Sequence, residues 1–166
     1  SDLIGRSGKE ELARKLYKEI RATDGVISAI DMMLHDYGPD RYSGSVNIEI
    51  DHKRSIGEVY EEIHRLQLRI MEEYHVTMVF GIYAVDEDTA AIVDIRRYIG
   101  KFVRVNEHVK SFHALYLSKE TGTLYCDLIV DYALRDWEEL RESFVEYMKK
   151  QYPEYEIALT IETEFV

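Results

Sequence analysis

Residues 26–51 read VISAIDMMLHDYGPDRYSGSVNIEID, and the pattern of this stretch returns in the second half of the chain. Its second half alternates apolar and polar side chains from Val46 to Asp51, which is the period of a half-buried strand. Its first half, residues 26–34, is apolar almost throughout, with Asp31 as the exception. Gly38 and Pro39 between the two halves are typical of a tight turn. The stretch therefore predicts a β-hairpin.

Helix patterns precede and follow this hairpin. Each begins with a serine and has a glutamate three residues later, the spacing of a capping box. Apolar residues then recur at helical spacing over residues 12–20 and 59–70. Gly25 is a plausible stop for the first helix, and alternation over residues 76–82 predicts a third strand. The capping residues are Ser7, Glu10, Ser55 and Glu58.

The same order of elements returns in the second half of the chain. Isoleucines at 92, 95 and 99 predict a helix that has Gly100 near its end. Two strand patterns, 109–117 and 124–130, follow with a turn between them, and then a helical pattern that stops before Pro153. A strand over residues 157–161 closes the unit. VISAIDMML and VKSFHALYL align without gaps, and the second begins 83 residues after the first, which indicates an internal duplication.

These patterns predict an α+β fold of two tandem ferredoxin-like (metallochaperone-like) αββαβ units. Each unit is a two-layer sandwich, with both helices on one face of its sheet. The opposite face would be half-polar, and such a face is suited to pairing with another unit. Because the chain has 13 tyrosines, we expect several of them to lie in an interface. The residues expected on the uncovered faces are Asn47, Glu49, Val79, Tyr83, Tyr125, Asp127, Ile129, Thr160 and Glu162.

Composition excludes several classes of function. The net charge of −11 over 166 residues argues against binding to nucleic-acid backbones or to anionic membrane surfaces. The single cysteine, Cys126, excludes an internal disulfide framework and is compatible with a reducing compartment. No apolar run approaches the roughly 18 residues that a membrane-spanning helix needs, and the N-terminus has no signal-peptide pattern.

An ordered set of short motifs resembles the cytoplasmic C-terminal domain of the cation diffusion facilitator (cation efflux) transporters. The match covers residues 2 to about 85, and the second unit resembles an extra repeat found in a subset of the family. Residues 2–5 are similar to the segment that leaves the last membrane helix. The other matching residues are Gly25-Val26, Ile30-Asp31, Gly38-Pro39, Tyr42, residues 47–50, the helix from Ser55 and the strand from Met78 to Tyr83.

The resemblance implies a fold, a location and a role. It implies a linker from the last membrane helix at residues 1–7, a cation-efflux αββαβ domain at 8–86 and a second repeat at 87–166. Such a domain forms a homodimer at the cytoplasmic face of the membrane and is attached to the transmembrane part of the same transporter. It senses divalent metal and helps to couple the two protomers of a proton-coupled antiporter.

The positions of the family's metal ligands carry other residue types in the first unit. Zinc prefers thiolate, imidazole or carboxylate ligands, and none of the residues present is a good one. We therefore expect the family's regulatory metal site to be lost from this unit. The residues at these positions are Ile30, Asn47, Tyr60, Gly81 and Tyr83.

The second unit retains better ligand types at the corresponding positions. By the internal alignment, His113 corresponds to Ile30, Asp127 to Asn47 and Glu162 to Tyr83. One histidine and two carboxylates on three neighbouring strands predict a site for Zn²⁺, Mn²⁺ or Fe²⁺. The alternative is that His113 is a satisfied strand histidine and that the two carboxylates are solvated.

The sequence contains no pattern that indicates an enzyme. There is no Cys-x-x-Cys, no glycine-rich phosphate loop and no G-x-S-x-G motif. Cys126 alternates with apolar neighbours, which favours a buried small side chain over a nucleophile. His35, His52 and His64 are interpreted as surface histidines.

Two other functions fit the same patterns. One is a stand-alone tandem ferredoxin-like regulatory protein that binds a small molecule between its sheets. The other is a purely structural dimerisation module without a ligand. The ordered match through Tyr42 favours the transporter domain, since neither alternative explains it.

Overall fold

The computed structural model describes residues 6–87 and 89–163. The expected linker therefore lies largely outside the described residues, as does the family-like segment at residues 2–5. Contacts divide the chain into two compact units, of which the first extends to Tyr83 and the second begins at Ala84. No described helix is both long enough and apolar enough to cross a membrane.

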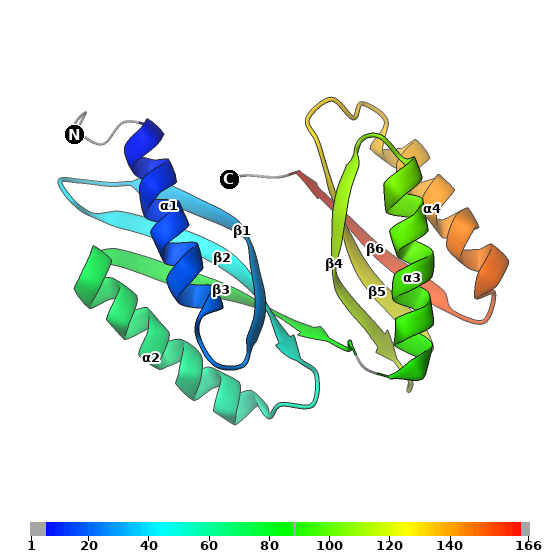
Figure 1. The fold of residues 1–166 in the computed structure, drawn as a ribbon, viewed down its shortest axis with the longest axis horizontal. Helices are drawn as coiled ribbons and strands as arrows, with labels where there is room; N and C mark the ends of the chain where they lie inside the picture. Colours follow the sequence, from blue (N-terminus) through cyan, green and yellow to red (C-terminus); the bar gives the residue numbers. More distant parts are fainter. Residues whose placement is uncertain (1–5, 88, 164–166) are drawn as a thin grey trace. The chain divides into compact units, whose positions relative to one another are not determined.

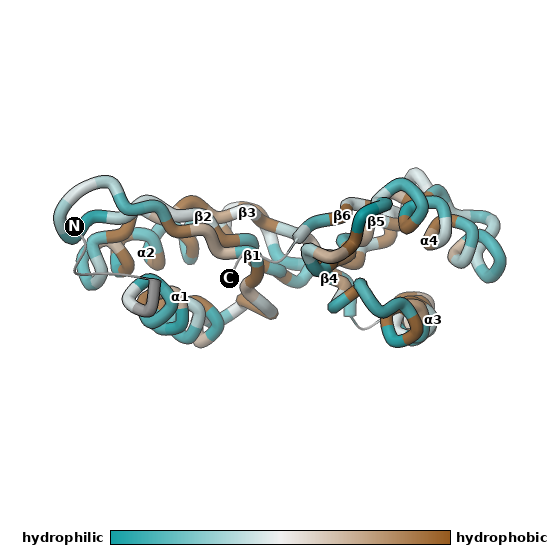
Figure 2. Tube along the Cα trace, turned by 90° about the horizontal axis from the view of Figure 1, so that it is seen from above, coloured by the Kyte–Doolittle hydropathy of each residue, from teal (hydrophilic) through white to brown (hydrophobic). Residues whose placement is uncertain are grey.

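The first unit contains two helices and a three-stranded sheet (Figure 1). The strands lie in the order β1-β2-β3, with β1 and β2 antiparallel. Both helices cover the same face of the sheet (Figure 2). The elements are α1 (Arg6–Arg21), β1 (Val26–Asp36), β2 (Tyr42–Asp51), α2 (Ile56–Tyr74) and β3 (Val76–Val85).

The second unit repeats this order and topology. Its strands lie in the order β4-β5-β6, with β4 and β5 antiparallel and β5 and β6 parallel. The prediction of two tandem αββαβ units in an α+β fold is therefore confirmed. The elements are α3 (Ala90–Val105), β4 (Val109–Ser118), β5 (Thr123–Val130), α4 (Trp137–Gln151) and β6 (Glu156–Thr163).

Each unit has a hydrophobic core of its own between its helices and its sheet. The predicted apolar stripes supply these cores, because helical and strand periods place their members on the inward face. Leu16, Ile48 and Leu66 are fully buried in the first core. Ile95 and Phe144 are fully buried in the second, and Cys126 lies there as the expected small apolar side chain.

The helix boundaries agree with the predictions except at the start of α1 and the end of α3. Helix α1 begins at Arg6, so the predicted cap Ser7 lies inside it. Ser55 accepts a hydrogen bond from the backbone N–H of Glu58 at 3.2 Å, as in a capping box. The expectation that α3 ends near Gly100 is wrong, because the helix continues to Val105. Phe102 extends the buried stripe beyond the glycine, and its burial outweighs the roughly 1 kcal/mol that glycine costs inside a helix. Helix α4 ends at Gln151, before Pro153, as predicted.

Gly25 connects α1 to β1 in a conformation that other residues rarely adopt. Its φ is +85°, and a Cβ placed on it would lie 1.5 Å from Nη1 of Arg54. The Arg54 guanidinium reaches past this glycine and donates two hydrogen bonds, of 2.8 and 2.7 Å, to the carboxylate of Glu62 on α2. The family-like glycine is therefore needed both for its backbone angle and for the passage of Arg54.

Candidate functional site

The two hairpins share one irregularity, which places the candidate ligands. In β1, the pairing with β2 shifts between Ile30 and Met33, and Asp31 between them has a φ of 57°. In β4, the pairing with β5 shifts between His113 and Tyr116, and Ala114 has the same φ. The two bulges lie 83 residues apart, which is the offset between the two units. The duplication therefore extends to the details of strand pairing.

His113 and Asp127 are brought together by this pairing. The two residues lie directly opposite each other on β4 and β5, just as Ile30 lies opposite Asn47 in the first unit. The imidazole Nε2 of His113 is 3.1 Å from Oγ of Ser111 on the same strand. Asp127 is only 5% exposed, so this carboxyl group is not the solvated side chain of the alternative interpretation. The correspondence inferred from the sequence is confirmed for this pair.

Glu162 is not opposite Asp127 but two residues further along the β5–β6 pairing. On β6, Thr160 pairs with Asp127, whereas Glu162 pairs with Ile129. Within residues 6–87 and 89–163, no three His, Cys, Asp or Glu side chains form a group that could hold a metal ion. The side-chain types suit a divalent metal, but these three residues are not grouped closely enough to bind one ion together. Metal binding by His113, Asp127 and Glu162 therefore stays a prediction.

The corresponding position of the first unit is filled by an amide. Asn47 donates a hydrogen bond from Nδ2 to Oδ2 of Asp31 at 3.4 Å. Gly81 lies beside it, since a Cβ on Gly81 would stand 2.2 Å from Oδ1 of Asn47. An amide and a glycine provide no zinc ligand here. The absence of a side chain at Gly81 instead leaves space for the Asn47 amide on the surface of the sheet.

Buried polar groups modify the expectation of an uncovered, half-polar sheet face. Glu49 is buried and accepts a short hydrogen bond from the hydroxyl of Ser28 on the neighbouring strand. Asp127 and Ile129 are buried as well, whereas Val79, Tyr125 and Thr160 are exposed. The faces opposite the helices are therefore mixed surfaces that expose only some of the residues expected there.

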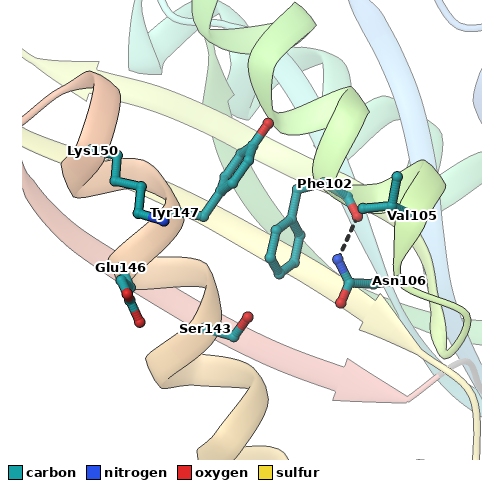
Figure 3. Close-up of a pocket in the computed structure, with 7 residues that line it drawn as sticks. All are labelled: Phe102, Val105, Asn106, Ser143, Glu146, Tyr147 and Lys150. Carbon is teal, nitrogen blue, oxygen red and sulfur yellow. Dashed lines mark hydrogen bonds between the residues drawn. The ribbon is translucent and has the colours of Figure 1, made fainter.

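A groove between α3 and α4 is a second candidate site (Figure 3). It has a volume of about 300 Å³, and the rings of Phe102 and Tyr147 lie between the two helices that form it. Asn106 donates a hydrogen bond to the carbonyl oxygen of Phe102 at 2.7 Å, which fixes one wall. Glu146 and Lys150 stand on the α4 side, so the groove combines an apolar floor with charged groups (Figure 3).

Tyrosines hold α3 and α4 together next to this groove. The rings of Tyr98 and Tyr147 stack with their centroids 4.1 Å apart. Each hydroxyl donates a hydrogen bond to the other residue's carbonyl oxygen, at 2.6 and 2.7 Å. Burial raises the pKa of Tyr147, so its hydroxyl stays protonated and able to donate at neutral pH. Tyr152 meets Tyr98 edge to face and in turn stacks on Tyr155. These tyrosines therefore pack inside the second unit.

Sequence patterns alone missed the groove and an exposed apolar stripe on α2. The stripe includes Tyr60, Leu68 and Met71, which are all exposed. Their spacing, in which Tyr60, His64 and Leu68 recur every four residues, could have identified it as a second apolar side of the helix. His35 and His64 are exposed, as expected for surface histidines, whereas His52 is half-buried.

No protein-family model matches the chain, and no curated protein matches it. Solved structures of the MamM CTD are similar to parts of it. A nickel form of a MamM CTD variant is 13% identical, with a TM-score of 0.42, and the similarity covers 46% of this chain and 99% of that chain. A zinc form of another variant is 15% identical, with a TM-score of 0.43, over 51% of this chain and 93% of that chain.

Proposed function

We propose that this chain is the cytoplasmic regulatory and dimerisation domain of a divalent-cation efflux transporter. The observation that carries the proposal is the ordered set of family-like residues in the first unit. Gly25 admits Arg54 beneath the α1–β1 turn, Asp31 occupies a bulge that requires a positive φ, and Gly38 and Pro39 form the hairpin turn. Each of these residues has a physical role in the fold that the family resemblance implies.

The proposed mechanism works through contacts between protomers. Val79 and Tyr125 are 62% and 46% exposed, and each alternates with neighbours in its unit's core, so each faces away from its helices. Tyr125 also lies near Tyr116 on β4, with ring centroids 6.3 Å apart. Exposed aromatic and apolar side chains within polar surroundings suit a protein interface. Pairing of two copies through such a face would favour one spacing of the attached membrane segments.

Sensing of metal is the finer part of the proposal and has its own test. A metal can favour one arrangement of protomers only if it binds the two arrangements with different affinities. Calorimetric titration with Zn²⁺ and with Mn²⁺ should show saturable binding to the wild type and its loss in His113→Ala. Ser111→Ala is the matched control, because it removes the hydroxyl beside the imidazole and leaves the three candidate ligands. Absence of binding to the wild type contradicts metal sensing but leaves the dimerisation role standing.

The transporter assignment is tested by the coding sequence upstream of this chain. Six apolar spans of membrane-crossing length before Leu3 would support it. A start codon at this point would contradict it and would favour a stand-alone regulatory protein.

The groove between α3 and α4 favours a second candidate, a tandem ferredoxin-like protein that binds a small molecule between two helices of one unit and not, as expected from the sequence, between its sheets. Its aromatic floor and the ammonium of Lys150 suit a compact aromatic carboxylate. Saturation-transfer NMR with a set of aromatic carboxylates and free amino acids tests it. Binding that is lost in Lys150→Glu and retained in Lys119→Glu would support this function, and absence of binding across the set would contradict it.

A further inference from the structure

Helix α2 has an exposed apolar stripe in addition to its buried one. Ile56, Tyr60 and Leu68 are 77%, 66% and 53% exposed, and Met71 is exposed as well. The ring of Tyr60 stacks on that of His64 one turn later, with centroids 5.9 Å apart. The stripe therefore extends over almost the whole length of the helix, from Ile56 to Met71.

The core of the first unit does not account for this stripe. Val59, Leu66 and Ile70 are the buried residues of α2 and form its sheet-facing side. At 100° per residue, Tyr60 and Met71 lie roughly a third of a turn away from them and Leu68 about half a turn away, all three on one common side. A continuous apolar strip that folding leaves exposed is typical of a surface that binds another protein.

The charges that flank the stripe are mainly acidic. Glu61 and Glu72 are exposed, and at 100° per residue they lie along the edge of the stripe next to Leu68. The other charges of the helix include two that are paired within the unit. Arg69 binds Glu19 at 2.7 Å, and Glu62 binds Arg54 at 2.7 Å. Arg65 is exposed and makes no ion pair among the described residues. Because α2 carries five glutamates against two arginines, the stripe nevertheless lies in a negative electrostatic field.

We propose that this stripe binds an amphipathic helix of a partner polypeptide whose apolar face is flanked by lysines or arginines. Apolar anchors would supply most of the affinity, and the charges along the edge of the stripe would set the orientation and the association rate. A second copy of α2 fits less well, because it brings the same glutamate-rich flanks face to face. An anionic lipid surface is repelled for the same reason. The inference does not depend on the transporter role.

The proposal is tested with two model peptides of 18 residues. One is a leucine–lysine amphipathic helix, and the other is the same helix with glutamate in place of lysine. Fluorescence anisotropy should show that the full chain binds the lysine peptide and not the glutamate peptide. Leu68→Ala and Tyr60→Ala should each weaken binding about tenfold, as expected for interface anchors. Raising the salt concentration should weaken it as well.

Val93→Ala is the matched control, because Val93 is an exposed valine on another helix. It should bind the lysine peptide like the wild type, and circular dichroism should show all variants folded. Equal binding of both peptides, or binding unchanged in both α2 variants, overturns the proposal. A wild-type dimer that dissociates in Leu68→Ala also overturns it, since the stripe would then bind a second copy. Binding of the chain to anionic vesicles that depends on Leu68 would overturn it in the same way.

Discussion

Gly25 is under two constraints at the scale of single residues, a positive φ and the passage of Arg54. We predict that Gly25→Ala lowers the free energy of unfolding by about 2–4 kcal/mol, because the left-handed conformation is strained and the Arg54–Glu62 contact must shift. Urea denaturation measures this. Gly57→Ala is the control, since a Cβ there meets nothing within 4 Å and alanine favours the helix. Equal stability of wild type and Gly25→Ala would contradict the steric role.

The Arg54–Glu62 pair should make stability depend on pH. The hydrogen bond from Arg54 lowers the pKa of Glu62 below its ordinary value of 4.5. The pair therefore contributes stability above that value, and the contribution is lost as the pH falls through the lowered pKa of the folded state. Glu62→Gln should cost about 2 kcal/mol at pH 7 and progressively less as the pH falls below the ordinary value and through the lowered pKa. The difference in unfolding free energy between variant and wild type, measured across this range, checks the prediction. A difference independent of pH would refute it.

At the scale of elements, the bulges in β1 and β4 are the features that the two copies share most closely. Asp31 has a φ of 57°, and aspartate tolerates this region better than most residues. Asp31→Val should destabilise the chain by about 1–2 kcal/mol, whereas Asp31→Asn should be nearly neutral. Thermal denaturation compares the two variants. An equally small effect of both would mean that the bulge is not under conformational constraint.

The tyrosine pair between α3 and α4 offers a second test at this scale. Tyr98→Phe removes the hydroxyl that donates to the carbonyl oxygen of Tyr147 and keeps the stacked ring. We expect a loss of about 1 kcal/mol in unfolding free energy by urea denaturation. Tyr37→Phe is the control, because Tyr37 is exposed in the hairpin turn. Indistinguishable effects of the two substitutions would show that the hydrogen bond contributes no net stability.

The predictable part of the fold is the part that local patterns determine. The hairpin at 26–51, the element order and the correspondence of His113 with Ile30 follow from periodicity and from the internal alignment. The positive φ of Asp31 and Ala114 could not be predicted, because a bulge depends on the pairing of two strands. The offset of Glu162, which pairs with Ile129 and not with Asp127, likewise depends on the β5–β6 register. Alternation predicted the face of each residue but not its burial, which depends on neighbouring side chains.

At the scale of the whole molecule, each unit has its own core, and its buried residues all come from that unit. Phe144→Ala should therefore destabilise the second unit by about 3–5 kcal/mol. Hydrogen exchange should show reduced protection in α3, α4 and β4–β6, with the protection of α1, α2 and β1–β3 retained. Leu16→Ala should produce the converse pattern. Loss of protection throughout the chain in either variant would mean that the two cores unfold as one.

Sedimentation equilibrium tests whether the chain pairs through a sheet face and so acts as a dimerisation domain. We predict a dimer for the wild type and a monomer for either Val79→Lys or Tyr125→Lys, depending on which unit provides the interface. Val93→Lys, on the exposed side of α3, should remain dimeric. A wild type that stays monomeric at all concentrations would contradict the claim, and so would a dimer that survives both sheet-face substitutions.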